Sequence, residues 1–247
     1  MNENLNTDDV KTEFNEMDQI WESSDLWHNH THKMIGRYLS RYTKQYFEPS
    51  FYILNAGSGG NSYGIIMKQK HVDIAENKIR GISDSLVADI CSLPFDDCSF
   101  DAVICVGSVL NYCDAIVAIQ ELCRVTKDNG YIILEYENSR SFEFFRTSVF
   151  NCSVSIATTF YQHHPEKIWV YSRQYINNIL NANNMAILKE SCFHVGTPFA
   201  YKLLKNPDAS SYFSKADILF GRIPFVKWFC SNIILICQKS SLKTQEL

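Results

Sequence analysis

The sequence has no surplus of positive charge. Its 247 residues include 23 lysines and arginines and 27 acidic residues, which gives a formal net charge of −4. Proteins that bind nucleic acids or anionic membranes through their overall charge carry a basic excess. The composition therefore gives no strong signal for a nucleic-acid partner, although it leaves a local basic patch open.

A long uninterrupted apolar run is also missing. The most apolar long segment, residues 218–237, is interrupted by Arg222, Pro224, Lys227 and Asn232. Burying such charges in a bilayer costs on the order of several kcal/mol. We therefore expect a loop followed by a buried strand here, and no membrane association. The N-terminal stretch MNENLNTDDVKTEF lacks the basic and apolar regions of a signal peptide.

Paired cysteine motifs are absent as well. The nine cysteines are odd in number, scattered along the chain and nowhere spaced C-x-x-C. Cys105 and Cys237 lie in apolar runs, where a thiol behaves as a small hydrophobic group. This usage does not fit a disulfide scaffold or a cysteine zinc site, whereas it fits a reducing compartment. We expect a cytoplasmic protein.

Repeats, low-complexity tracts and Pro/Gly-rich linkers are lacking too, so one domain is expected. What the sequence does contain is a regular alternation of apolar runs and amphipathic segments. This alternation predicts βαβ units and a parallel sheet covered by helices on both faces. The runs expected to form parallel strands are FYILNA (51–56), KHVDI (70–74), SLVAD (85–89), FDAVICVG (100–107) and YIILEYE (131–137).

Helices are expected between these runs. Residues 12–45 have aromatic and aliphatic residues at helical spacing and predict one or two amphipathic helices. A short helix is expected at 62–69, and a longer one over 114–130, closed by the Asn-Gly pair at its end.

The final third of the chain has a different pattern. Residues 171–184 predict a helix and 185–193 a strand, and a loop-rich stretch (194–230) precedes a terminal strand at 232–239. Because no clear crossover helix separates the two strands, we expect an antiparallel edge on the sheet.

Polar residues follow the first three strands, at the edge where open parallel sheets bind ligands. The glycine turn after the first strand lets backbone N–H groups approach a ligand. Alone, it is equally an ordinary strand-to-helix turn, because the pattern G-x-G-x-x-G breaks at Ser62. Asp73 ends the second strand, where a carboxylate can bind ribose hydroxyls, and Asp89 ends the third, where it can bind an exocyclic amine. Together these features predict a nucleotide-like cofactor site, with solvated strand-end acids as the alternative.

In this order and at similar spacing, four segments resemble the class I S-adenosylmethionine-dependent methyltransferases: ILNAGSGG, HVDIAEN, VADICSLPFDDCSFDAVICVGSVLNY and NGYIILEYEN. The resemblance covers residues 50–138 and extends to the helix–strand tail at 171–193. It implies a Rossmann-like α/β fold with a seven-stranded, mostly parallel sheet whose last strand is antiparallel. Nicotinamide dehydrogenases share the opening βαβ layout and are the alternative cofactor class. The VADICSLPF run and the broken third glycine favour S-adenosylmethionine.

The resemblance implies a site for S-adenosyl-L-methionine, with S-adenosyl-L-homocysteine as product. The glycine turn would line the methionine end, Asp73 the ribose, and Asp89 with Ile90 the adenine. The cofactor-binding residues expected on this basis are Asn55, Ala56, Gly57, Ser58, Gly59, Asp73, Ile74, Asp89, Ile90, Val106, Gly107 and Ser108. Asn55 departs from the family, which usually has an acid at that position. The segment between Asp73 and Asp89 leaves room for about one helical turn.

Residues 1–48 are predicted to form an N-terminal helical lid segment. Residues 49–247 then form the S-adenosylmethionine-binding domain, with a substrate-covering insertion at about 139–172.

Histidines in the lid segment are candidates for acceptor chemistry. Methyl transfer needs the nucleophile and the methyl group held in line about 3 Å apart, and a hydroxyl nucleophile also benefits from a general base. His28 and His32 are four residues apart and share a helix face, while His30 points elsewhere. We expect His28 as a base and His32 as a substrate contact; an exposed polar face is the alternative. No metal site is predicted, because a third ligand cannot be located.

The second group of candidates lies in FYQHHPEKIW (160–169) and at two strand ends. His163 and His164 are candidate bases, with Tyr161 as a substrate contact, and an exposed turn is the alternative. Tyr112 follows the fourth strand and Glu137 ends the fifth, so both could face the transferred methyl group. Core packing and a solvated strand end are their alternatives.

The sequence thus predicts a methyltransferase acting on an oxygen or nitrogen of a small organic acceptor, such as a biosynthetic intermediate. The alternatives are a non-catalytic binding or partner subunit with the methyltransferase fold, or a nucleic-acid or protein methyltransferase. The oligomeric state is left open.

Overall fold

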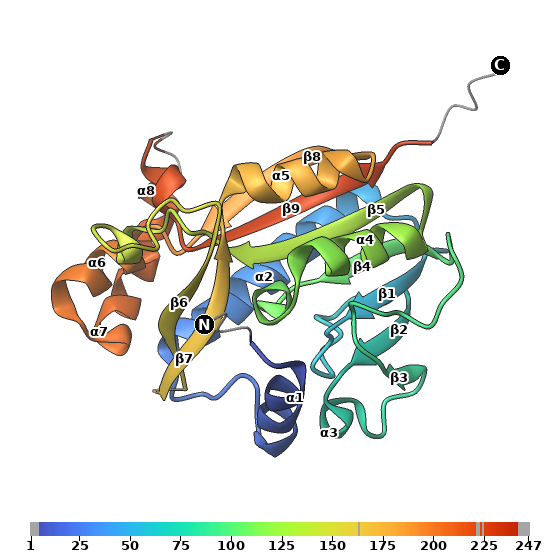
Figure 1. Cartoon of the computed structure of the whole chain (residues 1–247), viewed down its shortest axis with the longest axis horizontal. Helices are drawn as coiled ribbons and strands as arrows, with labels where there is room; N and C mark the ends of the chain where they lie inside the picture. The colour runs from blue at the N-terminus through green and yellow to red at the C-terminus, as the bar shows by residue number, and fades with distance from the viewer. Residues whose placement is uncertain (1–4, 163, 221–222, 224, 242–247) are drawn as a thin grey trace.

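A seven-stranded sheet in the order β3-β2-β1-β4-β5-β9-β8 forms the centre of the computed structural model (Figure 1). The structure describes residues 5–162, 164–220, 223 and 225–241. Strands β1 to β5 are mutually parallel, and β9 runs antiparallel between β5 and β8. The predicted fold class is confirmed. The strands are β1 Tyr52–Ala56, β2 Lys68–Asp73, β3 Ser85–Val87, β4 Phe100–Cys105, β5 Thr126–Glu137, β8 Met185–Phe193 and β9 Asn232–Lys239.

Helices cover both faces of this sheet (Figure 1). Helix α2 (Leu26–Tyr46) packs on one face, and α4 (Ala115–Val125) and α5 (Arg173–Ala182) pack on the other. Since side chains alternate along a strand, Ile53 and Ile104 join the core under α2, whereas neighbouring residues join the core under α4 and α5. The shorter helices near the site are α1 Thr7–Glu16, α3 Glu76–Ile79 and the 3-10 helix η1 Val109–Tyr112.

The expected helix at 62–69 is wrong. The chain crosses from β1 to β2 in an irregular loop, in which Tyr63 and Gly64 both have positive φ (51° and 69°). Such conformations cannot be part of a right-handed helix.

The expected end of the helix over 114–130 is also wrong. Helix α4 stops at Val125, and β5 begins at the next residue. Phe100 pairs with Thr126 while Ala102 pairs with Tyr131, so residues 127–130 bulge out of the ladder. The Asn-Gly pair therefore supplies a β-bulge instead of a helix cap.

Residues 139–231 contain more regular structure than expected. A separate antiparallel hairpin, β6 Val154–Tyr161 and β7 His164–Tyr171, projects beyond the end of the main sheet (Figure 1). The stretch expected to be loop-rich holds several short helices beside this hairpin. They are α6 Gly196–Leu204, α7 Pro207–Ser211, η3 Tyr212–Ala216, α8 Asp217–Phe220 and η4 Val226–Phe229, and η2 Phe142–Phe144 lies before the hairpin.

The apolar segment near the C-terminus forms the strand that its sequence predicts. The first six residues of β9 are buried between β5 and β8. Within the part of the chain that the structure describes, no helix has the length and apolar character needed to cross a membrane.

Candidate active site

A cavity of about 790 Å³ opens at the carboxyl ends of β1, β2, β3 and β4, and we call it the glycine-turn cavity. Eight of the twelve residues expected to bind a cofactor line it. They are Gly57, Ser58, Asp73, Ile74, Asp89, Ile90, Val106 and Gly107. Residues up to fifty positions apart in the chain thus meet at the strand ends, as the sequence predicted.

The turn after β1 needs its first glycine for two independent reasons. Gly57 has φ of +68°, and a Cβ atom there would lie 2.4 Å from both methyl groups of Val109 on η1. The backbone N–H groups of Gly57 and Ser58 both donate to the carbonyl of Val72, at 2.8 and 3.0 Å. The turn is therefore fixed against β2 below it and η1 beside it, with its backbone facing the cavity.

Asp73 joins this turn to the end of β2. Its Oδ2 accepts from the N–H of Gly59 at 2.7 Å, and its Oδ1 accepts from the N–H of Ala75 at 2.9 Å. Burial raises the pKa of Asp73, although these backbone hydrogen bonds act in the opposite direction. Each carboxylate oxygen has a second lone pair for a ligand hydroxyl.

The other four expected cofactor residues lie elsewhere. Asn55 is 2% exposed, and its amide donates to the carbonyl of Asn61 at 2.8 Å and to Gln69 Oε1 at 3.1 Å. It therefore holds the irregular loop between β1 and β2 together and does not line the cavity. Ala56 is fully buried, and Ile20 covers Gly59, with Cδ1 2.5 Å from where a Cβ atom would be. Ser108 lines the neighbouring cavity described below.

Glu135 is a site residue that the sequence analysis missed. It is fully buried, and one carboxylate oxygen accepts from the N–H groups of Gly107 (3.0 Å) and Ser108 (2.7 Å). Its other oxygen accepts from the side chain of Asn232 at 2.7 Å. Burial raises the pKa of Glu135, and these three donors oppose that rise. An acid inside the apolar run of β5 was the available signal, because a buried carboxylate needs donors.

The N-terminal segment covers the glycine-turn cavity. Its residues among the cavity lining are Thr7, Val10, Phe14, Ile20 and Trp21. On one side, Lys78 Nζ donates to the carbonyl of Met17, and Asn77 N donates to Asn15 Oδ1 at 3.0 Å. On the other side, the Tyr161 hydroxyl donates to the carbonyl of Ile20. The segment is thereby fastened to both α3 and the hairpin. Its action as a lid stays a prediction.

A second cavity of about 440 Å³ lies beside the first, and we call it the hairpin cavity. The two share Phe14, Ile20, Trp21, Gly107 and Tyr112 in their linings. The residues found only in the hairpin cavity are His28, Thr31, Ser108, Glu137, Thr159, Phe160, Tyr161, Glu166 and Ile168. Gly107 and Tyr112 thus mark the place where the two spaces adjoin.

Two carboxyl groups that line the hairpin cavity have raised pKa values. Burial raises the pKa of Glu137 well above its usual range, and the nearby Glu143 and Glu135 add to the rise. Burial also raises the pKa of Glu166 to about 7, with Glu13 of α1 adding to it. Carboxyl groups with raised pKa values in a cavity are candidates for acid–base chemistry.

His28 lines the hairpin cavity and is held by Asp25, the residue that caps α2. Its Nδ1 lies 2.7 Å from Asp25 Oδ2, and its backbone N–H donates to Asp25 Oδ1 at 3.0 Å. Burial acts to raise the pKa of Asp25, but the hydrogen bonds and charge of His28 bring it below its ordinary value. A carboxylate on one ring nitrogen leaves the other nitrogen free to accept a proton.

Comparison with known proteins agrees with this arrangement. Residues 49–134 match a family model described as a methyltransferase domain. Residues 49–134 therefore carry a methyltransferase domain. The demethylmenaquinone methyltransferase of Lactobacillus johnsonii is 36% identical over 85 residues, which are 32% of this chain and 35% of that relative. The match therefore spans about a third of the relative's length.

Solved structures share the fold over a longer stretch of the chain. A putative S-adenosylmethionine-dependent methyltransferase from Listeria monocytogenes has a TM-score of 0.56 at 12% identity, covering 85% of this chain and 99% of its own. A 1,6-didemethyltoxoflavin-N1-methyltransferase from Burkholderia thailandensis has a TM-score of 0.52 at 9% identity, covering 95% and 87%. At such identities the likeness shows the fold.

The candidate catalytic and substrate residues fall into two groups. His28, Tyr112, Glu137 and Tyr161 come together in the hairpin cavity. His164 is exposed at the start of β7 and lines neither cavity, so its assignment as a base is corrected. His163 lies outside the described residues. His32 stacks on Trp21 with 4.8 Å between ring centroids and bonds Asn61, which places it behind the cover and not in the hairpin cavity.

Proposed function

We propose that this protein transfers the methyl group of S-adenosylmethionine to an amine nitrogen of a small acceptor with an apolar or aromatic body. The observation that carries the proposal is the pair of adjoining cavities. One is lined by the glycine turn and two strand-end acids, and the other is lined by aromatic rings and carboxyl groups. Small-molecule acceptors are also named for structural neighbours such as the 1,6-didemethyltoxoflavin-N1-methyltransferase.

The glycine-turn cavity has the chemistry that S-adenosylmethionine requires. Gly57 and Ser58 line this cavity, and a glycine lets a ligand lie close against the backbone of the turn. Asp73 keeps acceptor capacity toward the cavity for ribose hydroxyls. Asp89 and Ile90 would bind the adenine, and Gly107 would lie beside the methionine portion, next to the hairpin cavity. When bound, the cofactor supplies an activated methyl group on a sulfonium centre.

The lining of the hairpin cavity favours an amine. Glu137 and Glu166 are its acids, and among the lining residues that the structure describes there is no lysine or arginine. Phe14, Trp21 and Tyr161 add aromatic faces, which attract cations within about 6 Å. An ammonium group would offset the cost of charging two enclosed carboxyl groups, whereas a carboxylate or phosphate acceptor would be repelled.

The same residues provide the proton acceptor that an amine needs. An ammonium nitrogen has no lone pair, so it must lose a proton before it can attack the methyl carbon. Glu166, with its pKa raised to about 7 by burial and Glu13, can take that proton near neutral pH. The neutral nitrogen would then be free to form a bond to the methyl carbon that the cofactor would supply, with the C–S electron pair left on sulfur. His28, held by Asp25, is the second candidate for the base.

The test combines cofactor binding with acceptor turnover. We expect calorimetry to detect S-adenosylmethionine binding to the purified chain. We also expect S-adenosylhomocysteine to form with a panel of arylalkylamines and not with the matching carboxylic acids. Absence of binding at millimolar cofactor would overturn the enzyme assignment and leave a non-catalytic subunit. Turnover of the acids or alcohols but not the amines would overturn the acceptor class alone.

A further inference from the structure

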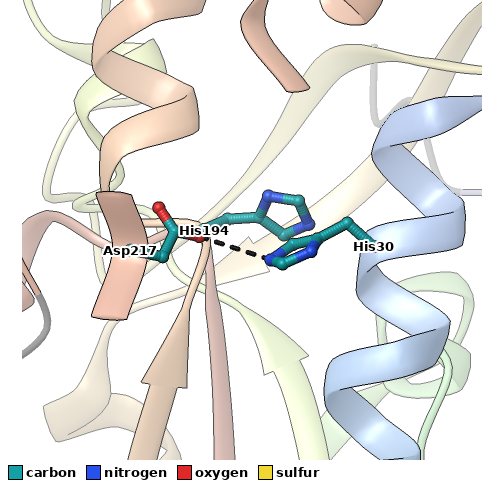
Figure 2. A group of neighbouring side chains, drawn as sticks. All are labelled: His30, His194 and Asp217. Carbon is teal, nitrogen blue, oxygen red and sulfur yellow. Dashed lines mark ion pairs between the residues drawn. The ribbon is translucent and has the colours of Figure 1, made fainter. Parts of the chain in front are cut away.

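Three potential metal ligands meet outside both cavities. His30 lies on α2, His194 follows β8, and Asp217 begins α8 (Figure 2). Each offers a ligand atom, and these atoms all lie within 4.8 Å of one another. Segments separated by more than 160 residues of sequence therefore converge on one point. Of the three histidines of α2, only His28 lines the hairpin cavity, so the acceptor chemistry does not use His30.

Two of these side chains face each other without a hydrogen bond. His30 Nε2 and Asp217 Oδ2 are 3.5 Å apart, and both atoms are buried without a hydrogen-bond partner (Figure 2). The Asp217 side chain is only 5% exposed. Normal N–H···O bonds measure about 2.7–3.2 Å, so the pair is too far apart for a good one. Two ligands of one tetrahedral zinc ion, each about 2.1 Å from the metal, would be about 3.4 Å apart.

The carboxylate is oriented by the protein backbone. Asp217 Oδ1 accepts from the N–H groups of Val195 (3.1 Å) and Gly196 (2.7 Å) at the start of α6. With one oxygen fixed in this way, the unpaired Oδ2 is directed at His30. A buried acceptor left unsatisfied is rare and costly, and a bound ion is one of its ordinary explanations.

His194 is fixed just as firmly. Its ring stacks on Trp27, with centroids 4.5 Å apart and planes 6° from parallel. One ring nitrogen lies 2.7 Å from the Thr197 hydroxyl and the other 2.9 Å from the Thr31 hydroxyl. Neutral imidazole is the form that binds metals, and its second nitrogen usually donates to a neighbouring oxygen.

We propose that His30, His194 and Asp217 bind one divalent transition-metal ion, with Zn²⁺ as the best fit. One threonine hydroxyl releases the His194 nitrogen that binds the ion, and the other keeps the ring in place. Water completes the tetrahedron, since three protein ligands are available. Two imidazoles and one carboxylate are ligands that zinc accepts, whereas calcium and magnesium prefer oxygen alone.

At this position the ion would cross-link elements that surround the hairpin cavity. It would tie α2 to α8 and, through the backbone bonds of Asp217, to the start of α6, whose Tyr201 contacts Phe160 of the hairpin. Thr31 both lines the hairpin cavity and bonds His194, and Trp27 contacts His194 and Phe160. Metal binding would therefore order one wall of the hairpin cavity without touching the proposed cofactor residues.

The test uses the full chain, freed of metal with a chelator and titrated with Zn²⁺. We expect one equivalent to bind and to raise the melting temperature. We expect affinity to fall at least about 100-fold in Asp217→Asn and His30→Gln, since each loses a ligand. Asp217→Asn keeps an oxygen for the backbone donors of α6. His164→Gln is the matched control, because it removes an exposed histidine that is not one of the three ligands.

Cysteines are the main competitors for the ion, since the chain has nine free thiols. Co²⁺ separates the two cases, because thiolate ligation gives an intense charge-transfer band that imidazole and carboxylate ligation lacks. Near-UV circular dichroism checks that each variant keeps its tertiary packing. Absence of Zn²⁺ binding by the wild type, or equal binding by wild type and Asp217→Asn, would overturn the proposal. A thiolate band in the Co²⁺ complex would also overturn it. A melting temperature that depends on Asp217 but not on added metal would overturn it too, and would identify His30 and Asp217 as a plain ion pair.

Discussion

Replacing Gly57 by alanine tests whether the glycine turn binds the cofactor through its backbone. The substitution has two costs that the structure separates. At φ of +68° an L-residue is strained, and its Cβ atom would lie 2.4 Å from both Val109 methyl groups. Ordinary carbon–carbon contacts are about 3.5–4.0 Å, so Val109 or the turn must move.

The magnitudes follow from these two terms. Left-handed backbone costs a non-glycine residue about 1–2 kcal/mol. Overpacking of this kind costs about 1–3 kcal/mol more. Gly64 provides the matched control, because it has nearly the same φ (+69°) and nothing within 4 Å of an added Cβ atom. Gly64→Ala should therefore show the strain alone, and the difference between the two variants should be about 1–3 kcal/mol.

The difference should appear mainly in cofactor binding, because Val109 and Gly57 both line the glycine-turn cavity. We expect Gly57→Ala to bind S-adenosylmethionine about 5- to 150-fold more weakly than Gly64→Ala in calorimetry. Chemical denaturation of both variants measures how much of this free-energy difference appears as lost folding stability. If the two variants match in affinity and in free energy of unfolding, the turn does not pack as the structure has it, and the reasoning fails.

Three further predictions concern the carboxyl groups. Because burial raises the pKa of Glu166 from 4.5 to about 7, the folded chain keeps a proton that the unfolded chain releases between those values, so stability should decline as pH rises through that window. Glu166→Gln should flatten this decline in urea titrations at several pH values, and it should remove the rise in turnover through pH 7. Glu135→Leu leaves three buried donors unpaired, at about 1–3 kcal/mol each, so the free energy of unfolding should fall by at least about 3 kcal/mol in denaturant titrations, and a smaller loss would contradict the bonding described. Asp73→Asn should weaken cofactor binding about 10- to 100-fold, since a charged acceptor bond contributes about 1.5–3 kcal/mol, and unchanged affinity would remove Asp73 from the site.

The sequence predicted the central sheet because its inner strands β1, β4, β5 and β9 contain apolar runs of strand length. Asp73 and Asp89 could be assigned to one edge without coordinates, since parallel strands place their carboxyl ends together. The Asn-Gly pair was predicted to cap a helix but lies in a β-bulge, which shows the limit of local sequence signals. Both uses require the left-handed conformation that Asn129 adopts (φ +60°), so only the pairing of β5 with β4 decides between them.

Contacts between distant segments were the part that no local pattern could supply. Nothing around Trp21 distinguishes a cofactor cover from an ordinary helix–helix linker. His30 gave no hint of its partners, because His194 and Asp217 lie in a region whose short helices have too few turns to show a periodic pattern. Glu166 likewise reads as a charged residue on a hairpin until the fold places it beside Glu13.

The loop that replaces the expected helix explains why the cover is needed. In many nucleotide-binding folds, the helix that follows the glycine turn directs its N-terminal N–H groups at the ligand. Here the loop between β1 and β2 has no helix, and the N–H of Gly59 donates to Asp73 instead. Ile20 packs over Gly59, and Met17 accepts a hydrogen bond from Lys78 on α3. The N-terminal segment thus supplies the wall that a helix would otherwise form. Because a few hydrogen bonds fasten this wall to α3 and to the hairpin, we predict that it separates from the site to admit the cofactor and the acceptor.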